Sequence, residues 1–237
     1  MTLAYVSLEA IAQANVPVLL PDTCILLDLL RSPRRENVDG NAMLAGKTIR
    51  DGIVESEMIG CVIAEQVRNE LNDNLPTVRE DTNSSLGKLR DEIARIDKWS
   101  EALGEASQTQ IGHFLTRVPV AEGVMTDILG AALTHATTPD LTYRAITRVT
   151  QRRTPAKLGK DSTKDCVVVE SYLEVATMLR DLGHTGNIVF ASSNTTEFLS
   201  GTPRTLNTDI ENEFAALGIK YSRALHETRY LLGLPQA

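Results

Sequence analysis

Short apolar runs alternate with longer amphipathic segments along this chain. Four apolar runs have the length and composition of buried strands, and they span residues 16–20, 58–63, 187–192 and 219–222. Between and around them, apolar positions recur with helical spacing at about 3–13, 23–31, 41–56, 64–75, 162–184, 208–218 and 223–233. Strands that alternate with helices in this way predict a mainly parallel sheet covered on both faces.

Proline and glycine mark the expected boundaries of these elements. The stretch "SPRRENVDGN", residues 32–41, has the composition of a loop. Pro76 is expected to stop the helix that precedes it, because proline lacks the N–H that continues a helix. Gly183 stands where a C-terminal cap belongs. Residues 82–153 are polar and helical in pattern, and we expect no strand among them.

These patterns define a fold class and a domain organisation. We expect an α/β fold of three layers, α/β/α, around a central mainly parallel sheet of Rossmann-like topology. The 237 residues, 42% of them hydrophobic, are enough for a single domain over 1–237. Residues 80–155 would form a helical insertion or lid on that domain.

Composition also restricts the cellular setting. No run of eighteen apolar residues is present, and Glu9 interrupts an N-terminal segment that has no basic leader, so we expect a soluble, cytoplasmic protein with no membrane contact. Cys24, Cys61 and Cys166 are widely spaced in apolar surroundings, which favours reduced core thiols over disulfides or a zinc site.

Acidic residues follow the predicted strands or begin the helices after them: Asp22, Glu70, Asp161, Asp165 and Glu197. The carboxyl ends of neighbouring parallel strands meet at one edge of a sheet, so these side chains are candidates to converge in one crevice. Carboxylate oxygens are the ligands preferred by Mg²⁺ and Mn²⁺. The pattern therefore predicts a site for a divalent cation.

Each of these residues also has a structural interpretation. Asp22 and Asp161 are good N-caps for the helices that follow them, and Glu70 could be an ordinary exposed helix residue. Asp165 is harder to explain structurally, because Asp161 lies one turn earlier and like charges at that spacing repel by about 0.2–0.5 kcal/mol. A positive charge between the two, from a lysine or a metal ion, would remove this repulsion.

Four segments together resemble the motifs of PIN-domain nucleases: "VLLPDTCILLDLL", "VIAEQVRNEL", "KDSTKDCVVVESYLE" and "VFASSNTTEF". The resemblance implies a PIN-like fold, and their order within an α/β alternation is more specific than any one of them. It also implies metal ligands at Asp22, Glu70 and Asp165, with Glu65 as the alternative to Glu70. Glu197 stands where the family more often has aspartate.

The resemblance further implies how the remaining site residues act. A second ion would lie near the accessory acid Asp161 and Glu197, and Ser193 and Asn194 would orient ligands or water. In-line attack of a metal-activated water on phosphorus would hydrolyse the phosphodiester bond, with Mg²⁺ or Mn²⁺ as cofactor.

A basic segment precedes the Asp161 end of this site. The net charge of the chain is −7, yet residues 141–160 contain no acidic residue. Three arginines recur every four residues, which would place them on one face of a helix. We expect this segment to bind the RNA backbone, although an ordinary solvated helix face is the alternative. Its basic residues are Arg144, Arg148, Arg152, Arg153, Lys157 and Lys160.

The function expected from sequence is therefore a divalent-metal-dependent ribonuclease. One role considered for it is that of the toxin in a toxin–antitoxin or defence system. The expected partners are an RNA substrate and an inhibitory protein such as an antitoxin, and a homodimer is left open. The alternative is a PIN-like module that binds RNA or protein without cleaving it.

Overall fold

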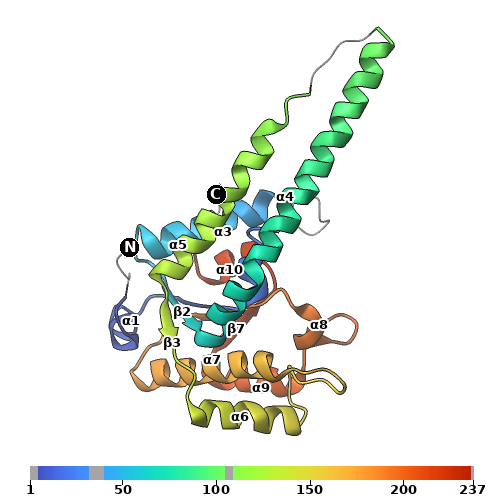
Figure 1. Ribbon diagram of the computed structural model, residues 1–237. Coiled ribbons are helices and arrows are strands. Elements are labelled where there is room, and N and C mark those ends of the chain that lie inside the picture. Colours follow the sequence, from blue (N-terminus) through green and yellow to red (C-terminus); the bar gives the residue numbers. More distant parts are fainter. Residues whose placement is uncertain (1–4, 32–39, 105–108, 236–237) are drawn as a thin grey trace.

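The computed structural model describes residues 5–31, 40–104 and 109–235, and a central sheet of five parallel strands organises them (Figure 1). The loop expected at 32–41 lies almost wholly outside the described residues. Across the sheet, the strands are β3 (Leu133–His135), β2 (Gly60–Ala64), β1 (Val18–Pro21), β4 (Ile188–Ala191) and β7 (Ile219–Ser222). All four predicted strands are present, and the predicted parallel pairing is confirmed.

Helices cover both faces of the sheet, which confirms the three-layer architecture (Figure 1). One face carries α3 (Gly40–Val54), α5 (Val118–Ala131) and α10 (Leu225–Leu231). The other carries α7 (Thr163–Asp181) and α9 (Thr208–Leu217), and α6 (Pro139–Thr150) packs on α7 in a further layer. A short helix, α1 (Leu8–Ala14), contacts α7.

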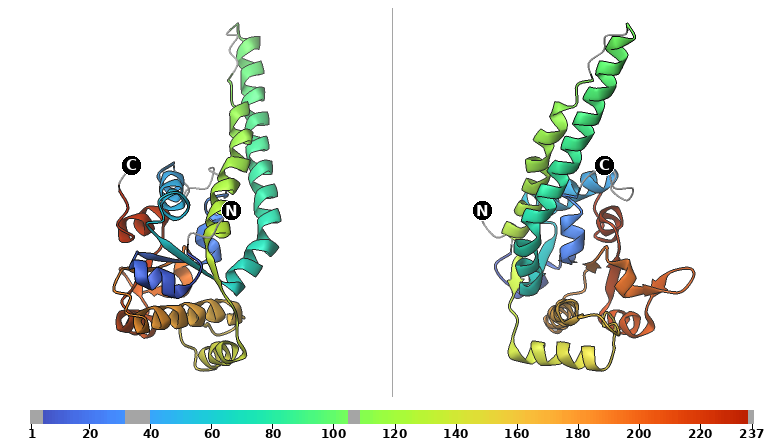
Figure 2. Two further views of the ribbon diagram at one scale, coloured as in Figure 1. Left: turned by 90° about the vertical axis from the view of Figure 1, so that its left-hand side faces the viewer. Right: turned by 45° about the vertical axis from the view of Figure 1, so that its right-hand side comes forward.

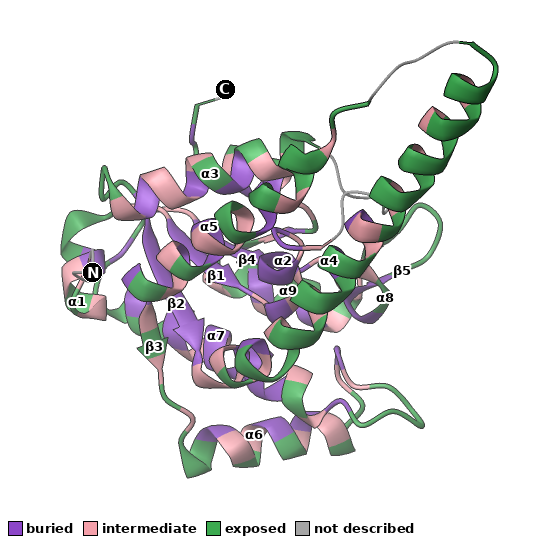
Figure 3. Ribbon diagram, turned by 45° about the horizontal axis from the view of Figure 1, so that its top comes forward, coloured by how far each residue is buried: buried purple, intermediate pink, exposed green. Residues whose placement is uncertain are grey.

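The core lies between the sheet and these helices. Every residue of β1, β2 and β4 is buried, as expected for strands covered on both faces (Figure 3). Phe190 of β4 lies at the centre of an aromatic cluster, with ring centroids of Tyr172, Phe198, Phe214 and Tyr221 between 5.2 and 6.0 Å away. This packing fixes the strand end that leads into the candidate site.

The helix after β2 does not end at Pro76. It continues as α4 (Glu65–Ala102), the long arm that projects from the domain (Figure 2). Pro76 is exposed, and so is Asn72, whose carbonyl loses its helical donor to the proline; water can hydrogen-bond that carbonyl instead. The short helix η1 (Gly112–Arg117) and α5 return beside α4 towards the sheet.

The region expected as a helical insertion, residues 80–155, is not a single unit. Its first part is the arm, but β3 pairs in parallel with β2 at the edge of the sheet, and α6 packs on α7. The expectation of no strand in this region was therefore wrong. Within the described ranges, no helix combines the length and the apolarity required to cross a membrane.

Candidate functional site

The strand order places a topological switch point between β1 and β4. From β1 the chain goes to β2 and β3 on one side, and then crosses to β4 on the other. Open α/β sheets bind ligands at the carboxyl ends of the strands at such a point. Asp22 directly follows β1 and Ser192 directly follows β4, and the Ser192 hydroxyl donates to Asp22 Oδ2 over 2.7 Å.

Asp22 is both a helix cap and the first residue of the candidate site. Its Oδ1 accepts the N–H of Thr23 at 2.7 Å, at the start of the short helix α2 (Thr23–Leu27). The Cys24 thiol donates to Oδ2 over 3.1 Å. Burial raises the pKa of Asp22, partly offset by these hydrogen bonds, and the charge of Glu70 raises it further. The carboxylate is thus held in one orientation at the sheet edge.

Thr23 connects Asp22 to Glu70. Its hydroxyl donates to Glu70 Oε2 over 2.8 Å, while the Gln66 amide donates to Oε1 over 2.9 Å. Glu65, the alternative to Glu70, has a different partner: its Oε2 accepts the N–H of Thr137. Of the two candidates, Glu65 and Glu70, Glu70 is the one whose charge raises the pKa of Asp22.

Asp165 and Glu197 complete a group of four carboxylates, the carboxylate cluster, with Asp22 and Glu70. Burial raises the pKa of Asp165 to about 7, with the charge of Glu197 next in effect and those of Asp22 and Glu70 contributing. Lys160 opposes this rise: its Nζ lies 3.7 Å from Asp165 Oδ2 and donates to Glu197 Oε1.

The Glu197 side chain is only 4% exposed, and its Oε2 has no hydrogen-bond partner among the described residues. A buried carboxylate oxygen without a partner is costly. In a cluster of acids, this oxygen indicates a place for a further donor or a cation.

Asp161 lies outside the carboxylate cluster. It is exposed, and its Oδ1 accepts the N–H of Thr163 at 3.0 Å, which also lowers its pKa. The nearby charge of Lys164 lowers that pKa further. The Asp161 side chain thus bonds to the first N–H of α7, whose N-cap residue is Ser162, and it does not reach the position of an accessory metal ligand.

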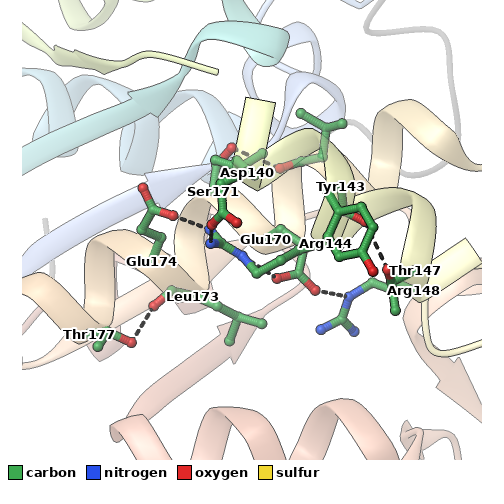
Figure 4. A network of polar contacts seen from close by, with 12 residues as sticks. Asp140, Tyr143, Arg144, Thr147, Arg148, Glu170, Ser171, Leu173, Glu174 and Thr177 are labelled. Atoms are coloured by element: carbon green, nitrogen blue, oxygen red, sulfur yellow. Dashed lines mark hydrogen bonds and ion pairs between the residues drawn. The ribbon is translucent and has the colours of Figure 1, made fainter. Parts of the chain in front are cut away.

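The basic segment does not form an open basic stripe. Arg148 is 1% exposed, and its guanidinium donates to Glu170 over 2.7 Å (Figure 4). It also donates to Glu213 and to the carbonyl of Thr154 over 2.7–2.9 Å. Burial with acidic partners prevents this guanidinium from reaching an RNA phosphate. The expectation that Arg148 contacts RNA was therefore wrong, and the residue instead joins α6 to α7 and α9.

The other basic residues have separate environments. Arg144 pairs with Asp140, Glu170 and Glu174 (Figure 4), and Arg153 pairs with Glu213. The ammonium of Lys157 donates to the carbonyl of Thr196, and Lys160 belongs to the carboxylate cluster. Arg152 is exposed, with a positive φ of 55°. Acidic residues from other helices, distant in the sequence, therefore neutralise much of the segment.

The chemistry of the carboxylate cluster fits Mg²⁺ or Mn²⁺. All of its donors are oxygens, and one of the buried ones, Glu197 Oε2, has no partner among the described residues. Burial, followed by the charge of Glu197, raises the pKa of Asp165. Among the described residues, no three His, Cys, Asp or Glu side chains form a ready-made metal cage. Mg²⁺ does not require one, because it keeps several waters and uses one or two carboxylates together with substrate phosphate.

Comparison with known proteins provides no relative for this arrangement. No protein-family model, no curated protein and no solved structure matches the chain. The resemblance to PIN-domain nucleases therefore rests on the sequence segments, and the case for a function rests on the geometry of the carboxylate cluster.

Three contacts in the site were missed from sequence. Ser192, rather than Ser193 or Asn194, donates to Asp22; Asn194 Oδ1 instead accepts the hydroxyl of Thr196. The register of β1 and β4 explains this contact. Pro21 pairs with Ala191, and the residues that directly follow them are Asp22 and Ser192. The linking role of Thr23 and the position of Lys160 depend on tertiary packing and have no comparable signal.

Proposed function

We propose that this protein is a divalent-metal-dependent ribonuclease of PIN-like type that hydrolyses phosphodiester bonds. The observation that carries the proposal is the carboxylate cluster at the carboxyl edge of the sheet, beside the switch point, with the unpartnered buried oxygen of Glu197. Acids gathered in this way repel one another unless a cation is added. The proposed cofactor is Mg²⁺ or Mn²⁺ and the proposed substrate is RNA.

The chain's own residues have distinct roles in this proposal. Asp22 and Glu70 are fixed by hydrogen bonds from Ser192, Thr23 and Gln66, so they would bind the cation without reorganising. The cation would supply charge for the transition state and lower the pKa of a bound water. Asp165, with a pKa of about 7, can hold or release a proton near neutral pH.

A protein-binding module is the second candidate function. Ile96 (57%) and Trp99 (67%) on the distal part of α4, and its C-cap residue Leu103 (65%), are exposed and recur at three- and four-residue spacing. Large apolar side chains grouped on a surface often mark contacts with another protein. An inhibitory partner such as an antitoxin, or a second copy of the chain, would bind there whether or not the carboxylate cluster is active.

Cleavage of a mixed single-stranded RNA in Mn²⁺ separates the two functions. We expect wild type to cut and Asp165→Asn to lose activity at least 100-fold. The matched control is Asp161→Asn, four residues earlier in the chain, which preserves a side-chain oxygen that can accept the N–H of Thr163 and should retain wild-type activity. If wild type does not cut, the nuclease proposal fails; if both variants cut equally, the site is misassigned.

A further inference from the structure

Lys160 holds an unusual position for a residue on an exposed loop. The side chain is 52% exposed, yet its ammonium donates to Glu197 Oε1, which belongs to a carboxylate only 4% exposed. The same Nζ lies 3.7 Å from Asp165 Oδ2. Lys160 thus enters from solvent and places one positive charge between two acids of the carboxylate cluster.

Glu197 depends on this lysine. Among the described residues, Lys160 is the ion-pair partner of its carboxylate, and the second oxygen, Oε2, has no hydrogen bond. A buried carboxylate is strongly destabilising unless a positive charge or several donors compensate it. The ammonium therefore performs a task that a metal ion performs in an acidic site.

The sequence-based expectation placed a second divalent ion beside Asp161 and Glu197. The structure leaves little basis for that ion, because Asp161 is exposed and bonded to the N–H of Thr163, and Lys160 already contacts Glu197. A second divalent ion beside Glu197 would also lie next to the Lys160 ammonium, and the two positive charges would repel each other.

We infer that Lys160 takes the place of a second metal ion, so that the carboxylate cluster binds one divalent cation on the side of Asp22, Glu70 and Asp165. This inference rests on the proposed function, because it assumes that the cluster is a metal site. Lys160 is a positioning residue in this arrangement: it neutralises Glu197 and limits how many cations the cluster accepts.

The number of bound ions tests the inference directly. We expect Mn²⁺ titration, followed by calorimetry and by the electron paramagnetic resonance signal of free Mn²⁺, to give one ion per wild-type chain. Lys160→Met should bind two, because Glu197 then lacks a cation. Lys160→Arg preserves the charge and should bind one. The matched control is Lys164→Met, which removes a lysine close in sequence that is exposed and acts on Asp161.

Thermal unfolding provides a second readout that also shows whether the variants fold. Lys160→Met should unfold at a lower temperature than wild type without metal, and Mn²⁺ should raise its Tm more than it raises that of wild type, because two ions then bind the native state. Two ions in wild type, or one in Lys160→Met with an unchanged Mn²⁺ response, would overturn the inference while leaving the metal site intact. No Mn²⁺ binding by wild type would overturn the proposed function itself.

Discussion

Replacing Asp165 with asparagine should stabilise the metal-free protein at alkaline pH, although it removes a proposed functional group. In the folded chain the pKa of Asp165 is raised to about 7 by burial and by the charges of Glu197, Asp22 and Glu70. In the unfolded chain this carboxyl is ionised above about pH 4. Its contribution to stability is therefore fully present below pH 4 and is lost as the pH rises through 7.

The structure sets the size of this effect. A change in pKa from 3.8 to about 7 corresponds to at most about 4 kcal/mol, at about 1.4 kcal/mol for each tenfold change in proton affinity. The side chain remains 28% exposed and Lys160 is close, so solvent screening should reduce the observed effect to about 1–2 kcal/mol. For a chain of 237 residues, that is an increase in Tm of about 2–8 °C.

Circular dichroism melts in EDTA, for wild type and Asp165→Asn at pH 5 and pH 8, measure this effect. We expect Asp165→Asn to melt higher at pH 8 and by a smaller margin at pH 5, where Asp165 carries a proton in the folded chain but is already ionised in the unfolded chain. Asp161→Asn should show no such pH-dependent gain, because Asp161 lies outside the carboxylate cluster. A variant that is less stable than wild type at pH 8, or equally stable at both pH values, would refute the electrostatic reasoning.

Three further predictions concern other parts of the molecule. Arg148→Met should destabilise the protein by about 3–5 kcal/mol in urea unfolding, because two carboxylates lose a guanidinium that is 1% exposed; a loss below 1 kcal/mol would count against the buried network. Ser192→Ala should weaken Mn²⁺ binding about 10-fold or more while Ser193→Ala does not, because Ser192 donates to Asp22, the proposed metal ligand; equal effects of the two variants would contradict this assignment. Trp99, the only tryptophan, should show the emission of a water-exposed indole that acrylamide quenches readily, and a buried, protected spectrum for the isolated protein would contradict the exposed arm.

The sheet could be predicted from sequence because its inner strands are apolar throughout. The three strands β1, β2 and β4 are buried at every position, so each produces an uninterrupted hydrophobic run. The edge strand Leu133–His135 has only three residues, none of them fully buried, and it leaves no such run. The prediction that the helix ends at Pro76 was wrong because it used only the local rule that proline breaks helices. Pro76 lies on the exposed side of α4, where the helix tolerates it.

The site was predictable where it follows strand ends and not where it depends on packing between distant elements. The charges of Asp22, Glu70 and Glu197 raise the pKa of Asp165, whereas Asp161, which the same pattern included, lies apart; their role as metal ligands stays a prediction. Arg148 looked like a member of an exposed stripe because its partners lie on α7 and α9, and helical periodicity does not reveal which neighbour covers a face. The assignment of nuclease activity stays a prediction.

The most direct test of the central claim is the chemistry of the RNA ends left by the wild-type protein in Mn²⁺. If water activated by a metal ion in the carboxylate cluster attacks phosphorus, the products carry no 2′,3′-cyclic phosphate, cleavage stops in EDTA and returns with added Mn²⁺, and Asp22→Asn abolishes it. Cyclic phosphate ends, cleavage that persists in EDTA, or no cleavage at all would contradict the account.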